Sequence, residues 1–241
     1  AVPALVRGLG HTAPTYSVGS RDRLSHRPRW LVTSSSFPIR QWSCGVRQSL
    51  REEKAIVREL GLRRRDALSI AARAAASAAI SDRILSVLGD RPTVSAAGYL
   101  PIRSEVDPRP AMEALAARGI AVAVPAIVNA DLVFRRLDGT EGMERQGFGT
   151  YAPGAGAEQL HPDLLIVPLA AFDLACGRCG YGKGFYDRAI ARLAEGGRLL
   201  TIGVAFDAQR VDHVPMEAHD RTLDMIVTES AVHRPSTAPG P

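Results

Sequence analysis

Helical patterns alternate with short apolar runs along most of the chain. Residues 49–65 are charged, with apolar positions at Ile56, Val57 and Leu60, which favours a helix with a basic face. Residues 67–88 are rich in alanine with larger apolar residues near helical spacing, and Gly89 is typical of a helix end. Two more helices are expected at 108–118 and 185–195.

Apolar runs between these helices predict strands, which we place at 93–100, 120–124, 132–137, 164–167, 199–206 and 223–228. Residues 142–157 hold five glycines and one proline, which favours a loop. Helices that alternate with short apolar strands predict an α/β fold. We expect a single three-layer, Rossmann-like domain with a mostly parallel sheet and helices on both faces.

The N-terminal segment differs in composition from the rest of the chain. The first fifty residues contain seven arginines and one acidic residue, Asp22, so this segment accounts for the net charge of +5 and the rest of the chain is close to neutral. We expect a basic, disordered extension over 1–48, the α/β domain over 49–234 and a flexible tail over 235–241. A transit peptide for organellar import, an upstream extension and a disordered tail all fit the composition of 1–48.

Composition also bears on compartment and partners. The apolar runs are shorter than the roughly 20 residues that a membrane helix needs, so we expect no membrane partner. Cys44, Cys176 and Cys179 are an odd set with one close pair, which favours a reducing compartment over a disulfide framework. We expect a cytoplasmic monomer, and no nucleic-acid partner because no recognisable RNA-binding motif is present.

The most informative stretch is a glycine-rich sequence, GYGKG at 180–184, between the strand at 164–167 and the helix at 185–195. Glycines let backbone amides approach phosphate oxygens, and the following helix N-terminus favours an anion. Lys183 and Arg178 add positive charge. Asp187, in the first turn of the helix, is placed to hold magnesium. The sequence therefore predicts a phosphate site.

The same stretch partly fits two other phosphate-binding motifs. Residues 177–183 fit the first seven positions of a Walker A motif, but Gly184 stands where the motif needs Ser or Thr for magnesium, which excludes an ordinary P-loop NTPase. The dinucleotide-binding fingerprint G-x-G-x-x-G needs its third glycine one position after Gly184, so this stretch does not match it. A tight turn without a ligand remains the structural alternative.

Four further patterns have plain structural alternatives. The CxxC at 176–179 lacks a thioredoxin-like context, and His161 and His213 are not at zinc-finger spacing from it. His219-Asp220 lacks the Gly-x-Ser-x-Gly elbow that a hydrolase triad would need, so a loop histidine is an equal interpretation. Lys54 with Arg58, and Glu105 with Asp107, also fit a solvated helix face and a solvated turn.

Four blocks in order resemble the 5-formyltetrahydrofolate cyclo-ligases, also called methenyltetrahydrofolate synthetases. The resemblance covers about residues 49–230. Its blocks are a basic helix with Lys54, Arg58 and Arg65; Leu100-Pro101 with Ser104-Glu105-Val106-Asp107; Ala171-Phe172-Asp173, Arg178 and GYGKGFYDR at 180–188; and Gly203–Asp207 through Val214-Pro215, His219-Asp220 and Val227-Thr228-Glu229.

The resemblance implies conversion of 5-formyltetrahydrofolate to 5,10-methenyltetrahydrofolate with Mg²⁺ and ATP, the co-substrate. The formyl oxygen attacks the γ-phosphate, the neighbouring folate nitrogen closes the ring, and phosphate leaves. The partners implied are a reduced folate and ATP. Such phosphoryl transfer needs mainly positioning and charge neutralisation, which the cationic residues can supply.

Carried over by position, the resemblance also implies roles for single residues. Lys183 and Arg178 would be catalytic, and Asp187 and Asp220 would hold the metal. Nucleotide would be bound by Lys54, Arg58, Arg178, Cys179, Gly180, Tyr181, Gly182, Lys183, Gly184, Phe185 and Tyr186. Folate would be bound by Leu100, Glu105, Phe148 and Tyr186.

The chain departs from the family pattern at several positions. Cys176 stands where a glycine is usual, Cys179 replaces an aliphatic residue, Ala152 replaces Glu or Gln, and Lys183 replaces a common glycine. Two other functions stay open on the sequence. One is a related α/β enzyme, a sugar-phosphate isomerase or an acyl or CoA transferase, that does not use ATP. The other is an RNA-binding module that uses residues 1–48.

Overall fold

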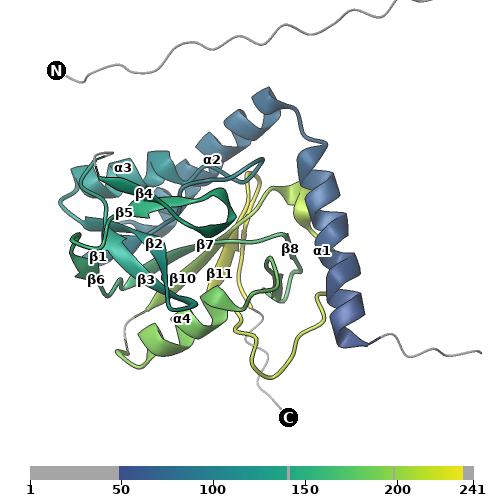
Figure 1. Cartoon of the computed structure of the whole chain (residues 1–241). Helices are drawn as coiled ribbons and strands as arrows, with labels where there is room; N and C mark the ends of the chain where they lie inside the picture. Colours follow the sequence, from purple (N-terminus) through teal and green to yellow (C-terminus); the bar gives the residue numbers. More distant parts are fainter. Residues whose placement is uncertain (1–48, 140–141, 198, 236–241) are drawn as a thin grey trace, which may run out of the picture. The chain divides into compact units, whose positions relative to one another are not determined.

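A mixed sheet forms the centre of the computed structural model, which describes residues 49–139, 142–197 and 199–235 (Figure 1). In this part of the chain the sheet has eight strands in the order β12-β11-β10-β7-β1-β2-β3-β6. The neighbours from β11 to β2 pair in parallel, and the outer strands pair antiparallel. The parallel strands are β1 (Ser95–Ala97), β2 (Ala121–Val128), β7 (Leu164–Pro168), β10 (Leu200–Val204) and β11 (Met225–Val227). The outer strands are β3 (Asp131–Arg136), β6 (Gln159–Leu160) and β12 (Val232–His233).

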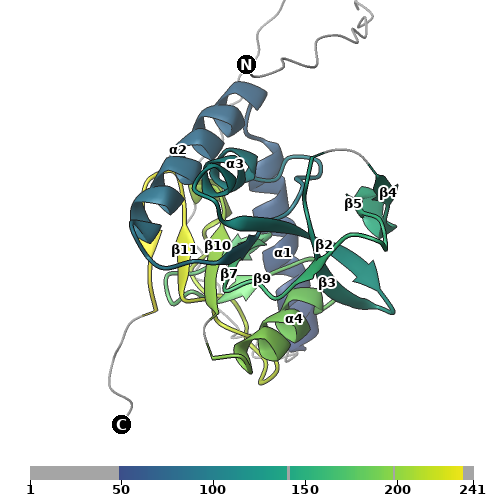
Figure 2. The same cartoon turned by 90° about the vertical axis from the view of Figure 1, so that its left-hand side faces the viewer.

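Helices cover both faces of the sheet, which confirms the predicted three-layer α/β class (Figures 1 and 2). Successive side chains of a strand point to opposite faces. Leu164 and Ile166 of β7 therefore belong to one core with α2 (Ile70–Leu88) and α3 (Arg109–Ala117). Leu165 and Val167 belong to a second core with α4 (Phe185–Ala194).

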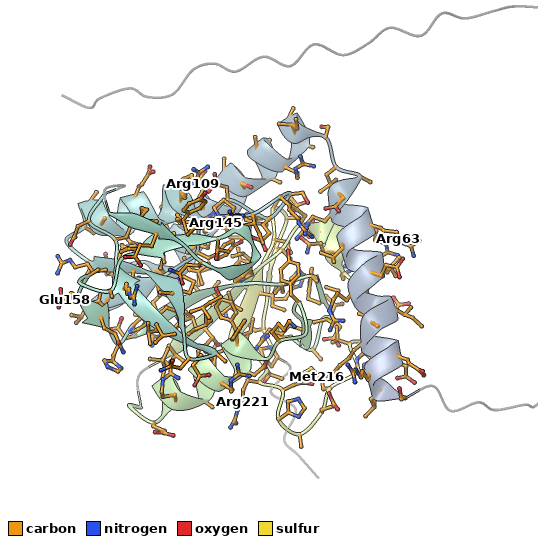
Figure 3. All side chains as sticks on the ribbon, viewed as in Figure 1. Arg63, Arg109, Arg145, Glu158, Met216 and Arg221 are labelled. Carbon is orange, nitrogen blue, oxygen red and sulfur yellow. The ribbon has the colours of Figure 1, made fainter. Side chains whose placement is uncertain are left out.

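The first helix, α1 (Leu50–Asp66), covers neither face of the sheet. It begins at a capping box in which Ser49 and Glu52 exchange hydrogen bonds, which fixes its start. It packs against the segment that follows β7 and the turn that follows β10, so it lies at the carboxyl ends of the parallel strands. Arg63 points away from the protein on its outer side (Figure 3).

Two expectations about loops were wrong. Residues 142–157 form an antiparallel ribbon of β4 (Met143–Arg145) and β5 (Tyr151–Pro153) around a 3₁₀ turn at Gly147–Gly149. A second hairpin, β8 (Ala171–Phe172) with β9 (Arg178–Cys179), stands between β7 and the glycine loop, where we expected a direct strand–loop–helix connection. Strands of two or three residues are too short to show an alternating pattern.

Several helix and strand boundaries also differ from the predicted ones. The second helix starts at Ile70, because the Ser69 hydroxyl caps it by accepting from the N–H of Ala72 at 3.1 Å. The strand expected at 93–100 is paired only over Ser95–Ala97, and the strand expected at 120–124 extends to Val128. The terminal expectations for 1–48 and 236–241 lie outside the described residues, and the domain division stays a prediction. Within the described residues, no helix is both long and apolar enough to cross a membrane.

The β2–β3 hairpin holds two consecutive non-glycine residues in the left-handed region. Val128 pairs with Asp131, so Asn129 and Ala130 form a two-residue turn, with φ of 48° and 64°. Such turns favour Asn-Gly, because only glycine adopts this conformation without strain from Cβ.

We therefore predict that Ala130→Gly increases the free energy of unfolding by about 1 kcal/mol. Urea denaturation followed by circular dichroism measures it. The matched control is Ala75→Gly, in the exposed interior of α2, which should decrease the free energy of unfolding by about 1 kcal/mol. A loss of stability in Ala130→Gly would contradict the strain assigned to this turn.

Candidate active site

One stripe of α1 is basic and faces the protein. Lys54, Arg58, Gly61 and Arg65 are spaced four, three and four residues apart, which places them on one side of a helix. Arg65 is 1% exposed and the Lys54 side chain 13% exposed. Lys54 is therefore not on a solvated face, and Arg58 is half-buried.

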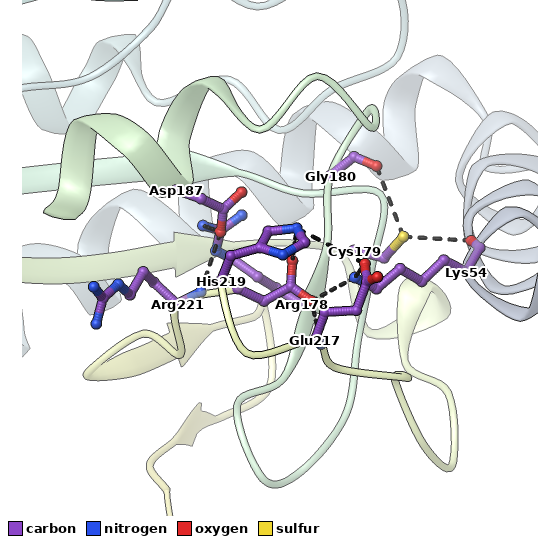
Figure 4. A network of polar contacts seen from close by, with 9 residues as sticks. Lys54, Arg178, Cys179, Gly180, Asp187, Glu217, His219 and Arg221 are labelled. Atoms are coloured by element: carbon purple, nitrogen blue, oxygen red, sulfur yellow. Dashed lines mark hydrogen bonds and ion pairs between the residues drawn. The ribbon is translucent and has the colours of Figure 1, made fainter. Parts of the chain in front are cut away.

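Lys54 is paired with two carboxylates from the loop before β11. Its Nζ lies 2.5 Å from an oxygen of Glu217 and 2.5 Å from an oxygen of Asp220 (Figure 4). Burial alone would lower the pKa of Lys54, but the hydrogen bonds to these carboxylates outweigh it and raise the pKa. Burial would raise the pKa of Asp220, and the contacts with Lys54 reverse this and lower it.

The same loop gathers groups that can hold a cation. Ligand atoms of Glu217, His219 and Asp220 all lie within 4.8 Å of one another. The N–H of Glu217 donates to Asp220 Oδ2 at 2.7 Å, which fixes the loop around that carboxylate. His219 is largely exposed. Sequence reasoning selected Asp220 and missed Glu217, although Glu217 lies three residues before it in the block that carried the resemblance.

Asp187 and Arg178 form a second charged pair beside this loop. Asp187 lies in the first turn of α4, and its Oδ1 accepts from Arg178 Nη2 at 2.7 Å and from the N–H of Arg221 at 3.1 Å. The second bond ties α4 to the residue that follows Asp220 (Figure 4). Among the described residues, the buried Nε of Arg178 has no hydrogen-bond partner. An unsatisfied buried donor of this kind is unusual in proteins and marks Arg178 as a residue whose position needs a reason beyond packing.

The glycine loop closes against α1. Arg58 Nε donates to the carbonyl of Gly180 at 2.6 Å, and a Cβ on Gly182 would lie 3.1 Å from Arg58 Nη2. Gly182 and Gly184 have φ of 83° and 64°, which favours glycine at both positions. Gly184 caps α4 without a side-chain bond, so the first N–H groups of the helix adjoin the loop.

Arg188 of α4 contacts the residues at the end of the glycine loop. Lys183 is exposed, and its carbonyl accepts from Arg188 Nη1 at 3.1 Å. The Arg188 guanidinium lies 5.3 Å from the centre of the Phe185 ring, and Arg188 Nε donates to Asp131 at 2.8 Å. Arg188 thus fixes the start of α4 against the β2–β3 hairpin.

The predicted folate-side residues lie around the turn after β1. Leu100 packs at the margin of the first core. Glu105 accepts from the N–H of Ile102 at 2.9 Å and from the Tyr181 hydroxyl at 2.8 Å. Burial raises the pKa of Glu105, and it raises the pKa of Tyr186. The side chain of Phe148 lies outside the described part of the chain.

The other acid of that turn, Asp107, is paired within its own segment. Asp107 is half-buried and pairs with Arg109 of the same segment at 2.6 Å. Glu105, in contrast, is bound to the glycine loop through Tyr181. The two acids that the sequence grouped together therefore have different surroundings.

The two cysteines of the CxxC pack in the apolar interior. Both side chains are buried, and burial raises the pKa of Cys176 to about 11 and also raises the pKa of Cys179. A thiol with a raised pKa carries little of the reactive thiolate. Cys176 has a φ of 62°, which is the conformation that the glycine usual at this position adopts without strain.

Comparisons with known proteins point to one family. The model of the 5-formyltetrahydrofolate cyclo-ligase family matches residues 45–229. The 5-formyltetrahydrofolate cyclo-ligase of Haemophilus influenzae is 26% identical over 160 residues, which cover 63% of this chain and 85% of that protein. That of Escherichia coli K12 is 30% identical over 141 residues, which cover 56% and 77%.

Solved structures agree with the sequence relatives. The 5,10-methenyltetrahydrofolate synthetase of Aquifex aeolicus aligns with a TM-score of 0.63 and 28% identity, over 78% of this chain and 95% of that one. The synthetase of Mycoplasma pneumoniae aligns with a TM-score of 0.60 and 23% identity, over 73% and 99%, which supports the fold.

Proposed function

This chain belongs to the 5-formyltetrahydrofolate cyclo-ligase family, and from that premise we propose that it converts 5-formyltetrahydrofolate to 5,10-methenyltetrahydrofolate with magnesium and ATP, releasing ADP and phosphate. The observation that carries the proposal is the contact between the basic stripe of α1 and the glycine loop, at the carboxyl edge of the sheet. Ligands of open α/β sheets bind at that edge.

The cationic residues would bind the triphosphate. Arg58 already contacts the glycine loop, and Lys54 lies beside it at the acidic pair. The amides of 180–184 and the start of α4 supply hydrogen-bond donors for phosphate oxygens. Lys183 and Arg178 would neutralise charge that develops on the transferred phosphoryl group. Phosphoryl transfer depends mainly on such positioning and neutralisation.

The acidic residues suit magnesium. Asp220, Glu217 and Asp187 offer carboxylate oxygens, the ligands that magnesium prefers. Asp220 and Glu217 belong to the cluster described above, and a backbone bond from Arg221 joins Asp187 to the residue after Asp220. When bound, magnesium would neutralise the phosphates of ATP. Lys54 holds the same carboxylates, so it would exchange part of this pairing for a phosphate.

The folate would meet the opposite side of the glycine loop. Glu105 would accept hydrogen bonds from the pterin, with Leu100, Phe148 and Tyr186 as apolar and aromatic contacts. The formyl oxygen would bond to the γ-phosphorus as ADP leaves. The neighbouring folate nitrogen would then bond to the formyl carbon, lose its proton, and release phosphate as the ring closes. A cytoplasmic, monomeric enzyme remains our expectation.

The direct test is turnover of the purified full chain. With 5-formyltetrahydrofolate, ATP and magnesium, we predict that the near-ultraviolet absorption band of the methenyl product appears, and that EDTA or omission of ATP stops it. Product formed without ATP would contradict the proposal and favour the related α/β enzyme class. Absence of product while nucleotide still binds would show that the substrate is another molecule.

The role of Lys183 is tested by separating the two Michaelis constants. We predict that Lys183→Ala raises the KM for ATP at least about tenfold, because a charged hydrogen bond to phosphate is lost, and leaves the KM for folate nearly unchanged. Lys183→Arg keeps the positive charge and should raise the KM for ATP by a smaller factor. Arg91→Ala, an exposed residue after α2, is the control. An equal rise in both constants would contradict the assigned role.

A further inference from the structure

Three segments that are distant in the sequence meet at the hydroxyl of Tyr181. Arg65 Nη1, from the last turn of α1, donates to this oxygen at 2.9 Å. The hydroxyl in turn donates to Glu105 Oε1, in the turn after β1, at 2.8 Å. Tyr181 itself lies in the glycine loop. A side chain of the predicted phosphate loop is therefore bound to the predicted folate side.

Arg65, the donor to the Tyr181 hydroxyl, is itself held in place by several contacts. Arg65 is 1% exposed, and its Nε donates to Ser104 Oγ at 2.9 Å and to Asp66 Oδ1 at 3.3 Å. The Ser104 hydroxyl also bonds to Asp66. Burying a guanidinium is costly unless its donors are satisfied, so these contacts keep Arg65 in one position.

The direction of the bonds follows from the donor inventory. Arginine can only donate, so the Tyr181 oxygen accepts from it and its proton points to Glu105. The other oxygen of Glu105 accepts from the N–H of Ile102 at 2.9 Å. Both carboxylate oxygens are thus oriented by the protein, and each keeps acceptor capacity for a further N–H group.

We propose that Tyr181 is a positioning residue for the reduced folate: its hydroxyl, held by Arg65, orients the Glu105 carboxylate to accept two N–H groups of the pterin. The glycine loop then serves both substrates, with its backbone toward the phosphates and its Tyr181 side chain toward Glu105. This inference rests on the proposed function. In this proposal the side chain of Tyr181 has a role that is separate from nucleotide binding.

The pKa of Glu105 provides a second readout of the Tyr181 contact, beside the two Michaelis constants. Burial raises the pKa of Glu105, and the hydrogen bonds from Ile102 and Tyr181 act against this rise. The charged and titratable groups that act on Glu105 are Arg65, Arg103, Tyr99, Tyr181 and Tyr186. Loss of the Tyr181 hydroxyl should therefore raise the pKa of Glu105 further.

The experiment is Tyr181→Phe in the full chain. We expect the KM for 5-formyltetrahydrofolate to rise about tenfold, and the KM for ATP to stay within about twofold, because one hydrogen bond to the carboxylate is lost. Only ionised Glu105 accepts both N–H groups, so kcat/KM for folate falls as pH drops through its pKa. In Tyr181→Phe this fall should begin at a higher pH.

Matched variants separate positioning from general damage. Tyr151→Phe, which removes a hydroxyl from a half-exposed tyrosine of β5, should leave both Michaelis constants and the pH profile unchanged. In a Glu105→Gln background, Tyr181→Phe should add less than about twofold to the folate KM, because coupled residues are not additive. Additive losses would overturn the proposal, as would equal rises in the two Michaelis constants.

A measurement without turnover keeps the inference distinct from the proposed function. An NMR titration of the Glu105 carboxyl in the substrate-free protein should give a higher pKa in Tyr181→Phe than in the natural chain. An unchanged pKa would overturn the assigned contact even if the enzyme is active. Absence of turnover by the natural chain would instead contradict the proposed function, whatever the titration shows.

Discussion

The site depends on the close approach of α1 to the segment that follows β7. A Cβ on Gly61 would lie 2.2 Å from the carbonyl oxygen of Ala170, so only glycine allows the helix to lie this near. Lys54 and Arg58 precede Gly61 on the same stripe, and Arg65 follows it by one turn. Because the helix backbone is fixed at Gly61, these cations reach the acidic loop, the glycine loop and the turn after β1.

The cations of this stripe of α1 all have hydrogen-bond acceptors in the protein, two of them carboxylates at Lys54, and these contacts explain why a helix so rich in charge can dock. Arg65 is buried against Ser104 and Tyr181, and Lys54 against Glu217 and Asp220. Removing one partner of such a pair leaves an uncompensated charge. Lys54 and its two carboxylates also suit a polyphosphate and magnesium, because each can exchange its protein partner for a group of opposite charge on the ligand. The arrangement therefore supports both docking of the helix and the proposed chemistry.

Much of this could be predicted from the sequence, and the limits have physical causes. The periodic pattern found α3 and α4 nearly to the residue, and the apolar run found β7. The β4–β5 and β8–β9 ribbons were missed, because two or three residues among glycines show no period. From the sequence alone, Tyr181 is assigned to the phosphate loop because its neighbours are the glycines of that loop. Its bond to Glu105 crosses 76 positions, and the bond from Lys54 to Glu217 crosses 163, so neither has a local signal.

The most direct test is the nucleotide affinity of Gly61→Ala, measured by calorimetry beside Glu59→Ala on the exposed side of α1. Alanine is a better helix former than glycine by about 1 kcal/mol, so a local effect alone would strengthen α1. We predict that Gly61→Ala weakens ATP binding at least about tenfold while the sheet stays folded, and that Glu59→Ala binds ATP normally. Unchanged affinity in Gly61→Ala would contradict the claim that the docked stripe of α1 forms the nucleotide site.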